Sequence, residues 1–97
     1  MSKPIKPLTL NQRKELAKIG HPKHLDSLVH DTDPCVKRLV AKFGNDKHRD
    51  QLVHDPSWWI KWIVARNGNE NHARTLLKDK EETIQREAAE RLRELGK

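Results

Sequence analysis

Histidine is the residue type whose spacing in this sequence first suggests chemistry. Five of the six histidines fall into two columns that repeat every 24 residues, namely His24, His48 and His72, and His30 and His54. Imidazole side chains bind metal ions and transfer protons. The ligands of one metal ion must all lie about 2 Å from it, whereas packed helices of neighbouring repeats are about 8–10 Å apart. The columns therefore predict no metal site.

A structural role is the better interpretation of these histidines. His48 lies four residues before Leu52, on the same face of a predicted helix, where it can pack or hydrogen-bond between units. His30 and His54 fall near a predicted helix C-terminus, where a positive charge is favourable.

Other catalytic chemistry has little basis in the residues. Cys35 is the single cysteine, so the sequence offers no intramolecular disulfide and no cysteine-based metal cluster. It aligns with Trp59, one step from the apolar stripe, and we expect a small packed side chain there. The glycines are single and widely spaced, unlike a phosphate-binding loop. We predict that the protein is not an enzyme and holds no cofactor or metal.

Basic residues and tryptophans are the candidates for binding. They fall on one flank of the first predicted helix of each unit, in pairs four residues apart that share a helix face. The predicted partner-binding residues are Trp58, Trp62, Arg66, Arg38, Lys42, Lys14, Lys18, Lys37 and Lys61. Trp59 is expected to pack inward, and Trp58 and Trp62 to be at least half exposed. Two alternatives stay open: the basic residues form an ordinary solvated face, or the two tryptophans cover a groove between repeats.

The elements that position these side chains repeat every 24 residues. Ala17-Lys18-Ile19-Gly20 aligns with Ala41-Lys42-Phe43-Gly44 and with Ala65-Arg66-Asn67-Gly68, without an insertion. Periods of about 20–50 residues are typical of stacked supersecondary units. Each unit reads as a helix that ends at a glycine in the left-handed conformation, followed by a helix of about two turns.

Local signals predict where the helices begin. Thr9 and Gln12 form a capping box for the first helix, and the Asp33-Pro34 and Asp55-Pro56 pairs resemble an N-cap followed by proline. The last helix, from about residue 81 to 95, is highly charged and has Leu92 in place of the repeated glycine, as expected of a terminal cap.

The pattern from Asp31 to Gly44, Asp-x-x-x-x-Val-Lys-x-x-Val-Ala-x-x-Gly, resembles a HEAT repeat. The 24-residue period is more similar to that of the variant leucine-rich repeat family, whose units pair an α-helix with a shorter, partly 3₁₀ helix. The resemblance implies an all-α fold, a right-handed α-solenoid of about three to four two-helix units with a longer C-terminal capping helix. It covers residues 9–90, and we expect a single repeat domain over residues 9–97 after a flexible basic tail at 1–8. The iron–sulfur segment of one variant-family member is not carried over, because Cys35 stands alone.

Composition leaves two classes of partner. Of the 97 residues, 34% are apolar and 35% are charged, a ratio that suits a thin stack, and the net charge of +6 attracts anionic partners. We favour an interaction module, such as an adaptor or inhibitor, that binds a protein with an acidic surface. The alternative is nucleic acid bound along the basic residues, and self-association through the tryptophans is also open. No apolar run approaches a membrane span and no secretory signal is evident, so we expect a cytoplasmic protein.

Overall fold

The computed structural model describes residues 8–97 as an all-α chain of seven helices. The helices are α1 (Leu10–Ile19), α2 (Pro22–Leu28), α3 (Pro34–Phe43), α4 (Asp46–Leu52), α5 (Trp58–Asn67), α6 (Glu70–Leu76) and α7 (Glu82–Glu94). The predicted tail at residues 1–8 lies, apart from Leu8, outside the described residues. None of the helices between residues 8 and 97 has the length and apolar composition needed to cross a membrane.

The helix boundaries repeat with the period of the sequence. The first residues of α1, α3, α5 and α7 are 24 positions apart, and so are those of α2, α4 and α6. The short second helices each contain seven residues and are α-helical, rather than partly 3₁₀ as the family resemblance implies. The chain is therefore built from one helix pair used three times, followed by α7.

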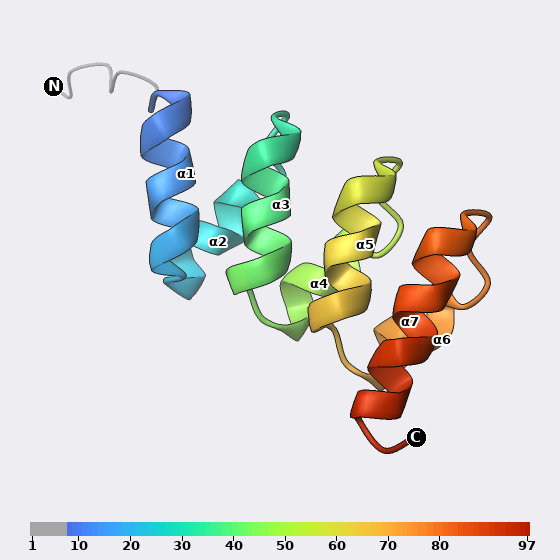
Figure 1. Ribbon diagram of the computed structural model, residues 1–97. Coiled ribbons are helices and arrows are strands. Elements are labelled where there is room, and N and C mark those ends of the chain that lie inside the picture. Colours follow the sequence, from blue (N-terminus) through green and yellow to red (C-terminus); the bar gives the residue numbers. More distant parts are fainter. Residues whose placement is uncertain (1–7) are drawn as a thin grey trace, which may run out of the picture.

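The helices pack in sequential order. α1 packs against α3, α3 against α5, and α5 against α7, while each short helix packs against the long helices before and after it. Figure 1 shows the four long helices as a row of steps, with the short helices behind them and the two termini at opposite ends. The molecule is consequently elongated, with extents of 54 × 23 × 18 Å.

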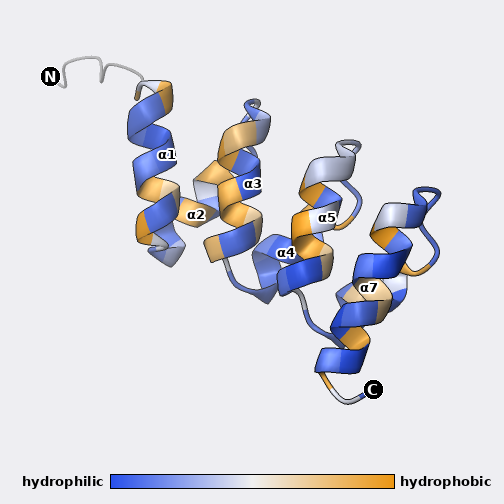
Figure 2. Ribbon diagram, in the orientation of Figure 1, coloured by the Kyte–Doolittle hydropathy of each residue, from blue (hydrophilic) through white to orange (hydrophobic). Residues whose placement is uncertain are grey.

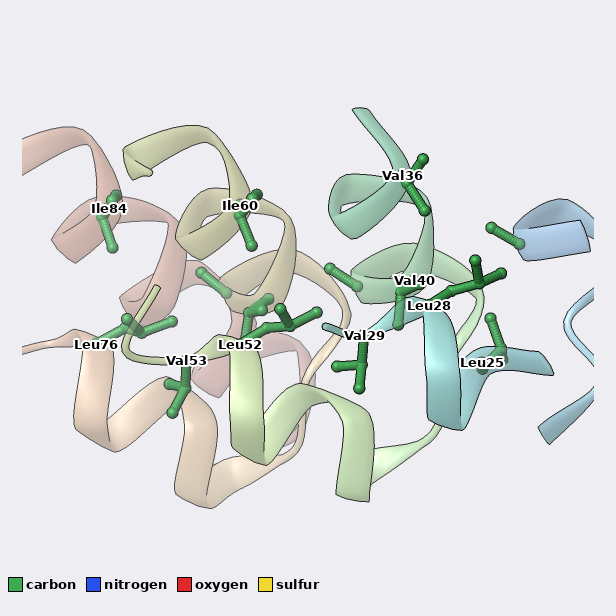
Figure 3. Packing of buried hydrophobic residues seen from close by; sticks show 14 of the residues in the cluster. Leu25, Leu28, Val29, Val36, Val40, Leu52, Val53, Ile60, Leu76 and Ile84 are labelled. Carbon is green, nitrogen blue, oxygen red and sulfur yellow. The ribbon is translucent and has the colours of Figure 1, made fainter. Parts of the chain in front are cut away.

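The core is a row of aliphatic side chains at equivalent repeat positions. Val36, Ile60 and Ile84 are fully buried on successive long helices, and Leu52 and Leu76 face them from the short helices (Figure 3). Each unit contributes too few of these side chains to form a core alone, so burial depends on the neighbouring unit.

Phe43 lies three residues after the buried Val40, at helical spacing, but it does not belong to this core. Its ring is 40% exposed at the C-terminal end of α3, and Lys42 Nζ lies 5.3 Å from the ring centroid. The apolar stripe of α3 is therefore shorter than the sequence suggests.

The helix starts follow the repeat register more closely than the local cap signals. The capping box of Thr9 and Gln12 is present, and Asp33 caps α3 by accepting a hydrogen bond from the Cys35 backbone N–H at 2.8 Å. The prediction for Asp55-Pro56 is wrong, because α5 starts two residues later, with Ser57 at its N-cap. Asp55 instead accepts the Ser57 N–H at 2.9 Å and holds the preceding turn.

Only one of the three repeated glycines ends its helix in the left-handed conformation. Gly20 has φ 75°, whereas Gly44 and Gly68 both have φ −79°, which any residue adopts. A Cβ atom on Gly44 would lie 2.5 Å from the Val40 carbonyl oxygen and 2.9 Å from His48 Nδ1. Glycine is favoured there because a side chain would overlap with the Val40 carbonyl oxygen of α3 and with His48 of α4, not because of φ.

The last helix closes the core as a polar cap. α7 runs for 13 residues, and Figure 2 shows it as mostly hydrophilic with short apolar bands. Leu92 packs against the core at the position of the repeated glycine. Arg91 donates hydrogen bonds to the Gly68 and Asn67 carbonyl oxygens at 2.8 and 3.5 Å, which satisfies the C-terminal end of α5.

Candidate partner-binding surface

Two buried histidines join the successive short helices. His48 is 1% exposed, and its Nδ1 accepts the Asn45 backbone N–H at 3.1 Å. Because Nδ1 is an acceptor, the ring proton lies on Nε2, which donates to Asp26 Oδ1 on α2 at 2.7 Å. His72 repeats both bonds with Asn69 and with Asp50 on α4. The expected structural role of these histidines is confirmed.

The first member of this histidine column differs from the other two. His24 is exposed, and its ring lies 5.5 Å from that of His21. No short helix precedes α2 in the described residues, so no aspartate is placed to accept from His24. The histidine column thus bonds to an aspartate of the preceding short helix only where two units meet, and we call these contacts the histidine joints.

A second set of repeated contacts fixes the loops between units. Lys37 Nζ lies 2.7 Å from Asp55 Oδ2, and Lys61 Nζ lies 2.6 Å from Asp79 Oδ2. Arg13 makes the same contact with Asp31 at 2.7 Å. These aspartates also accept backbone N–H groups two residues further on.

The electrostatics of Asp79 show how firmly such a loop is held. Partial burial alone would raise the pKa of Asp79, but the hydrogen bonds from Lys61 and from the Glu81 backbone N–H outweigh that effect and lower it.

Lys37 and Lys61, predicted from the sequence to bind a partner, are thus part-buried and already paired. They are not included in the site developed below.

The single cysteine and the candidate metal ligands do not come together as a metal site in the described residues. Cys35 is exposed, so the expectation that it packs as a small core side chain is wrong. Between residues 8 and 97, no group of three histidine, cysteine, aspartate or glutamate side chains is placed to hold a metal ion.

The three tryptophans gather at the N-terminal half of α5. The rings of Trp58 and Trp59 meet edge to face with centroids 5.1 Å apart, and those of Trp59 and Trp62 are stacked at 5.6 Å with an interplanar angle of 22°. Trp58 is 50% exposed and Trp59 is 39% exposed. Trp62 is only part-exposed and packs against the core. The predicted exposure is therefore confirmed for Trp58 and wrong for Trp59 and Trp62.

Two arginines extend this aromatic cluster into a mixed surface. The Arg38 guanidinium lies over the Trp59 ring at 5.9 Å, and that of Arg66 lies over the Trp62 ring at 5.0 Å. Such contacts hold an arginine in place while leaving its N–H groups directed to other partners. We call Arg38, Trp59, Trp62 and Arg66 the Trp–Arg platform.

A small hollow adjoins the platform between α3 and α5. It has a volume of about 170 Å³ and is lined by Lys42, Ile63, Arg66 and Asn67. Lys42 makes no ion pair among residues 8–97, whereas Arg66 Nε forms an ion pair with Glu87 Oε1 of α7 at 3.5 Å. The Arg66 side chain is 55% exposed, so its guanidinium can contact a further carboxylate beside Lys42 and the aliphatic floor of Ile63.

The remaining predicted residues lie farther along the molecule. Lys14 and Lys18 belong to α1, which α3 separates from α5 and its tryptophans (Figure 1). Lys18 also has Glu15 at 3.4 Å. The structure thus brings together the predicted residues of α3 and α5, and leaves those of α1 at the edge.

Sequence reasoning missed one residue of the platform and the two aspartates that bind the buried histidines. Trp59 was aligned with Cys35 and assumed to face inward, but both side chains are exposed. Asp26 and Asp50 were not recognised as partners of the buried histidines. Their recurrence at the 24-residue period, each 22 residues before a histidine, was the signal that could have found them.

The surface has to be interpreted from its own geometry. The chain matches no protein-family model, no curated protein and no solved structure in the comparisons made.

Proposed function

We propose that this protein is a non-enzymatic interaction module that binds an acidic protein on the Trp–Arg platform. The observation that carries the proposal is the aromatic pair of exposed Trp59 and part-exposed Trp62, with a guanidinium group over each ring. Tryptophan and arginine are the residue types most enriched at the energetic centres of protein interfaces. A platform that is ordered before binding loses little side-chain entropy when a partner arrives.

The hollow beside the platform explains the preference for an acidic partner. Lys42 presents an unpaired ammonium group at its rim, Arg66 presents the part of its guanidinium that Glu87 does not face, and Ile63 provides an apolar base. A glutamate or aspartate side chain would gain charge-assisted hydrogen bonds there. Cations at this rim would also raise the rate of association with an acidic surface.

The same contacts count against nucleic acid as the main ligand. Single-stranded nucleic acid is bound by stacking bases on exposed aromatic faces. Trp59 and Trp62 stack on each other, and Arg38 and Arg66 lie over them, so these contacts compete with bases for the ring faces. In addition, α7 has Glu90 at the repeat position of Lys42 and Arg66, which interrupts that column of basic residues.

We further propose that the chain is a right-handed α-solenoid of HEAT-like units, nearest in period to the variant leucine-rich repeats, with residues 9–97 as one domain. Helix pairs whose bounds recur every 24 residues support this architecture. Stacks of this kind expose long surfaces relative to their volume, as a binding module requires. A cytoplasmic location stays a prediction.

The proposal is tested by charge reversal at the hollow. Lys42→Glu with Arg66→Glu is compared with Lys23→Glu with Lys47→Glu, which makes the same charge change at exposed positions of the short helices. Tagged wild type and both variants are used to capture partners from native lysate, with and without nuclease. We expect a nuclease-resistant protein that the hollow variant loses and the control retains.

Three other results would overturn the proposal. Recovery of nucleic acid alone, with affinity falling steeply as salt increases, would make the basic residues a phosphate-binding surface. Equal loss of the partner in both variants would show that only net charge matters. Concentration-dependent dimers in sedimentation, abolished by the hollow variant, would identify the platform as a self-association surface.

A further inference from the structure

A second cavity lies at the other end of α5 from the hollow. Its volume is about 490 Å³, and its lining includes Pro56, Trp58, Lys78 and Lys80. Lys61 and Asp79 also line it, but they are paired with each other at 2.6 Å. Because this pair is internally neutral, the charge that the cavity presents to a ligand comes from the other residues. We call this cavity the Trp58 groove.

The groove has a positive rim and an aromatic wall. Lys78 and Lys80 are exposed and make no ion pair among residues 8–97, and Glu81 is the one acid of the lining that lacks a cationic partner. The half-exposed Trp58 ring, with Pro56 beside it, provides apolar surface. The groove therefore combines the same two features as the hollow, a pair of cations and an apolar base.

The three tryptophans connect the groove to the hollow. Trp58 lines the groove, touches Trp59 edge to face, and Trp59 stacks on Trp62, over which Arg66 of the hollow lies. The three rings thus form one chain of contacts between the two cation pairs, with Trp58 and Trp59 exposed and Trp62 part-buried. A ligand that binds both ends would cross apolar surface in the middle.

The rise along α5 sets a lower limit on the length of such a ligand, because Lys78 and Lys80 lie beyond α5, in the loop before α7. Trp58 and Arg66 are eight residues apart on α5, which corresponds to about 12 Å along the helix axis. An extended peptide rises about 3.3 Å per residue, so about four residues span this distance.

We infer that the partner is recognised through an extended acidic peptide with two acidic positions at least four residues apart and an apolar side chain between them. This inference rests on the proposed function and specifies its ligand. One carboxylate binds between Lys42 and Arg66, and the other binds between Lys78 and Lys80. The intervening apolar side chain packs on the half-exposed ring of Trp58, which the arginines of the platform do not cover. Charge complementarity at both ends selects a peptide over a neutral or basic segment.

The test uses the full chain and a displayed library of random peptides about twelve residues long, three times this lower limit. We expect enriched peptides to share two acidic positions at least four residues apart with an apolar residue between them. A synthetic copy of the most enriched peptide is then titrated against wild type and three variants. These are Trp58→Ala, Lys78→Glu with Lys80→Glu, and the short-helix control Lys23→Glu with Lys47→Glu.

Loss of affinity by about tenfold or more in both groove variants, but not in the control, is the expected result. Circular dichroism of each variant shows whether the helices are intact, and Lys78 and Lys80 are exposed enough for that variant to fold. Peptides that bind the wild type and the groove variants equally, yet fail on Lys42→Glu with Arg66→Glu, would overturn the inference and leave the proposed function standing. Enriched peptides without paired acids would also overturn it. Peptides insensitive to both pairs of lysine and arginine changes would overturn the inference and the proposed function together.

Discussion

The histidine joints allow one position to be compared with itself in two settings. His48 and His24 occupy the same place in the repeat, but His48 is buried between two units and His24 is exposed at the end of the stack. We expect His48→Ala to destabilise the fold strongly and His24→Ala to change the free energy of unfolding by less than about 0.5 kcal/mol.

The magnitude for His48→Ala follows from the contacts that are lost. The bond from the Asn45 N–H to Nδ1 contributes about 1 kcal/mol, and its loss leaves a part-buried donor without a partner. The bond to Asp26 contributes less than a fully buried charged bond, about 1 kcal/mol, because the Asp26 side chain is 72% exposed and returns to water. The cavity left by the ring adds about another 1 kcal/mol. The total is about 3 kcal/mol.

Urea unfolding followed by far-ultraviolet circular dichroism measures this difference. The dependence of the unfolding free energy on urea should be the same in both variants, since a change in slope would indicate that part of the stack unfolds separately. A double-mutant cycle with Asp26→Ala isolates the contact between the two side chains. Equal costs for His24→Ala and His48→Ala, or a cost below about 1 kcal/mol for His48→Ala, would refute the assignment of the joint.

Three further predictions concern the core, the loops and the glycines. Leu52→Ala should cost about 2–5 kcal/mol in urea unfolding, because Leu52 is 2% exposed, and a cost below 1 kcal/mol would place this column outside the core. Asp79→Asn should flatten the decrease in unfolding free energy below about pH 5. Because its pKa is lowered in the folded protein, the Asp79 carboxylate stabilises the fold above its unfolded pKa of about 3.9, and this stabilisation is lost as the pH falls through the folded pKa. The same decrease in unfolding free energy at acid pH in wild type and Asp79→Asn would contradict this prediction. Gly44→Ala should cost about 1–3 kcal/mol by steric overlap, and Gly44→Ser should cost no less. An unchanged melting temperature for Gly44→Ala would mean that Val40 and His48 shift away from the added methyl group without cost.

The period of the sequence predicted the fold well because it constrains every unit at once. The boundaries of α3 and α5 follow from a single alignment, and that alignment is correct even where a local signal disagrees. At Asp55-Pro56 the local signal favours an early helix start, but the packing of Ile60 beside Val36 fixes the register of α5. Tertiary packing overrides the cap preference at that point.

The candidate site was harder to predict because exposure on a stack depends on the neighbouring unit. Trp59 and Trp62 are three residues apart on one helix, and periodicity alone cannot tell which of them lies against the core. The ion pairs of Lys37 and Lys61 could not be predicted from the sequence for a related reason. Their aspartates are 18 residues further on, a separation that corresponds to neither the helical spacing nor the period.

The two halves of each histidine joint have a consequence for the growth of such a molecule. A block from Asn45 to Gly68 carries His48, which bonds to an aspartate in the preceding unit, and Asp50, which accepts from a histidine in the following unit. If this segment of the gene were duplicated in tandem, each copy would therefore meet its neighbours with a complete donor and acceptor, without any new substitution. Growth is limited at the C-terminal end, where Arg74 takes the position of the repeated aspartate and bonds to Glu70. The chain can thus lengthen from within, by insertion of whole units, while its two ends stay as they are.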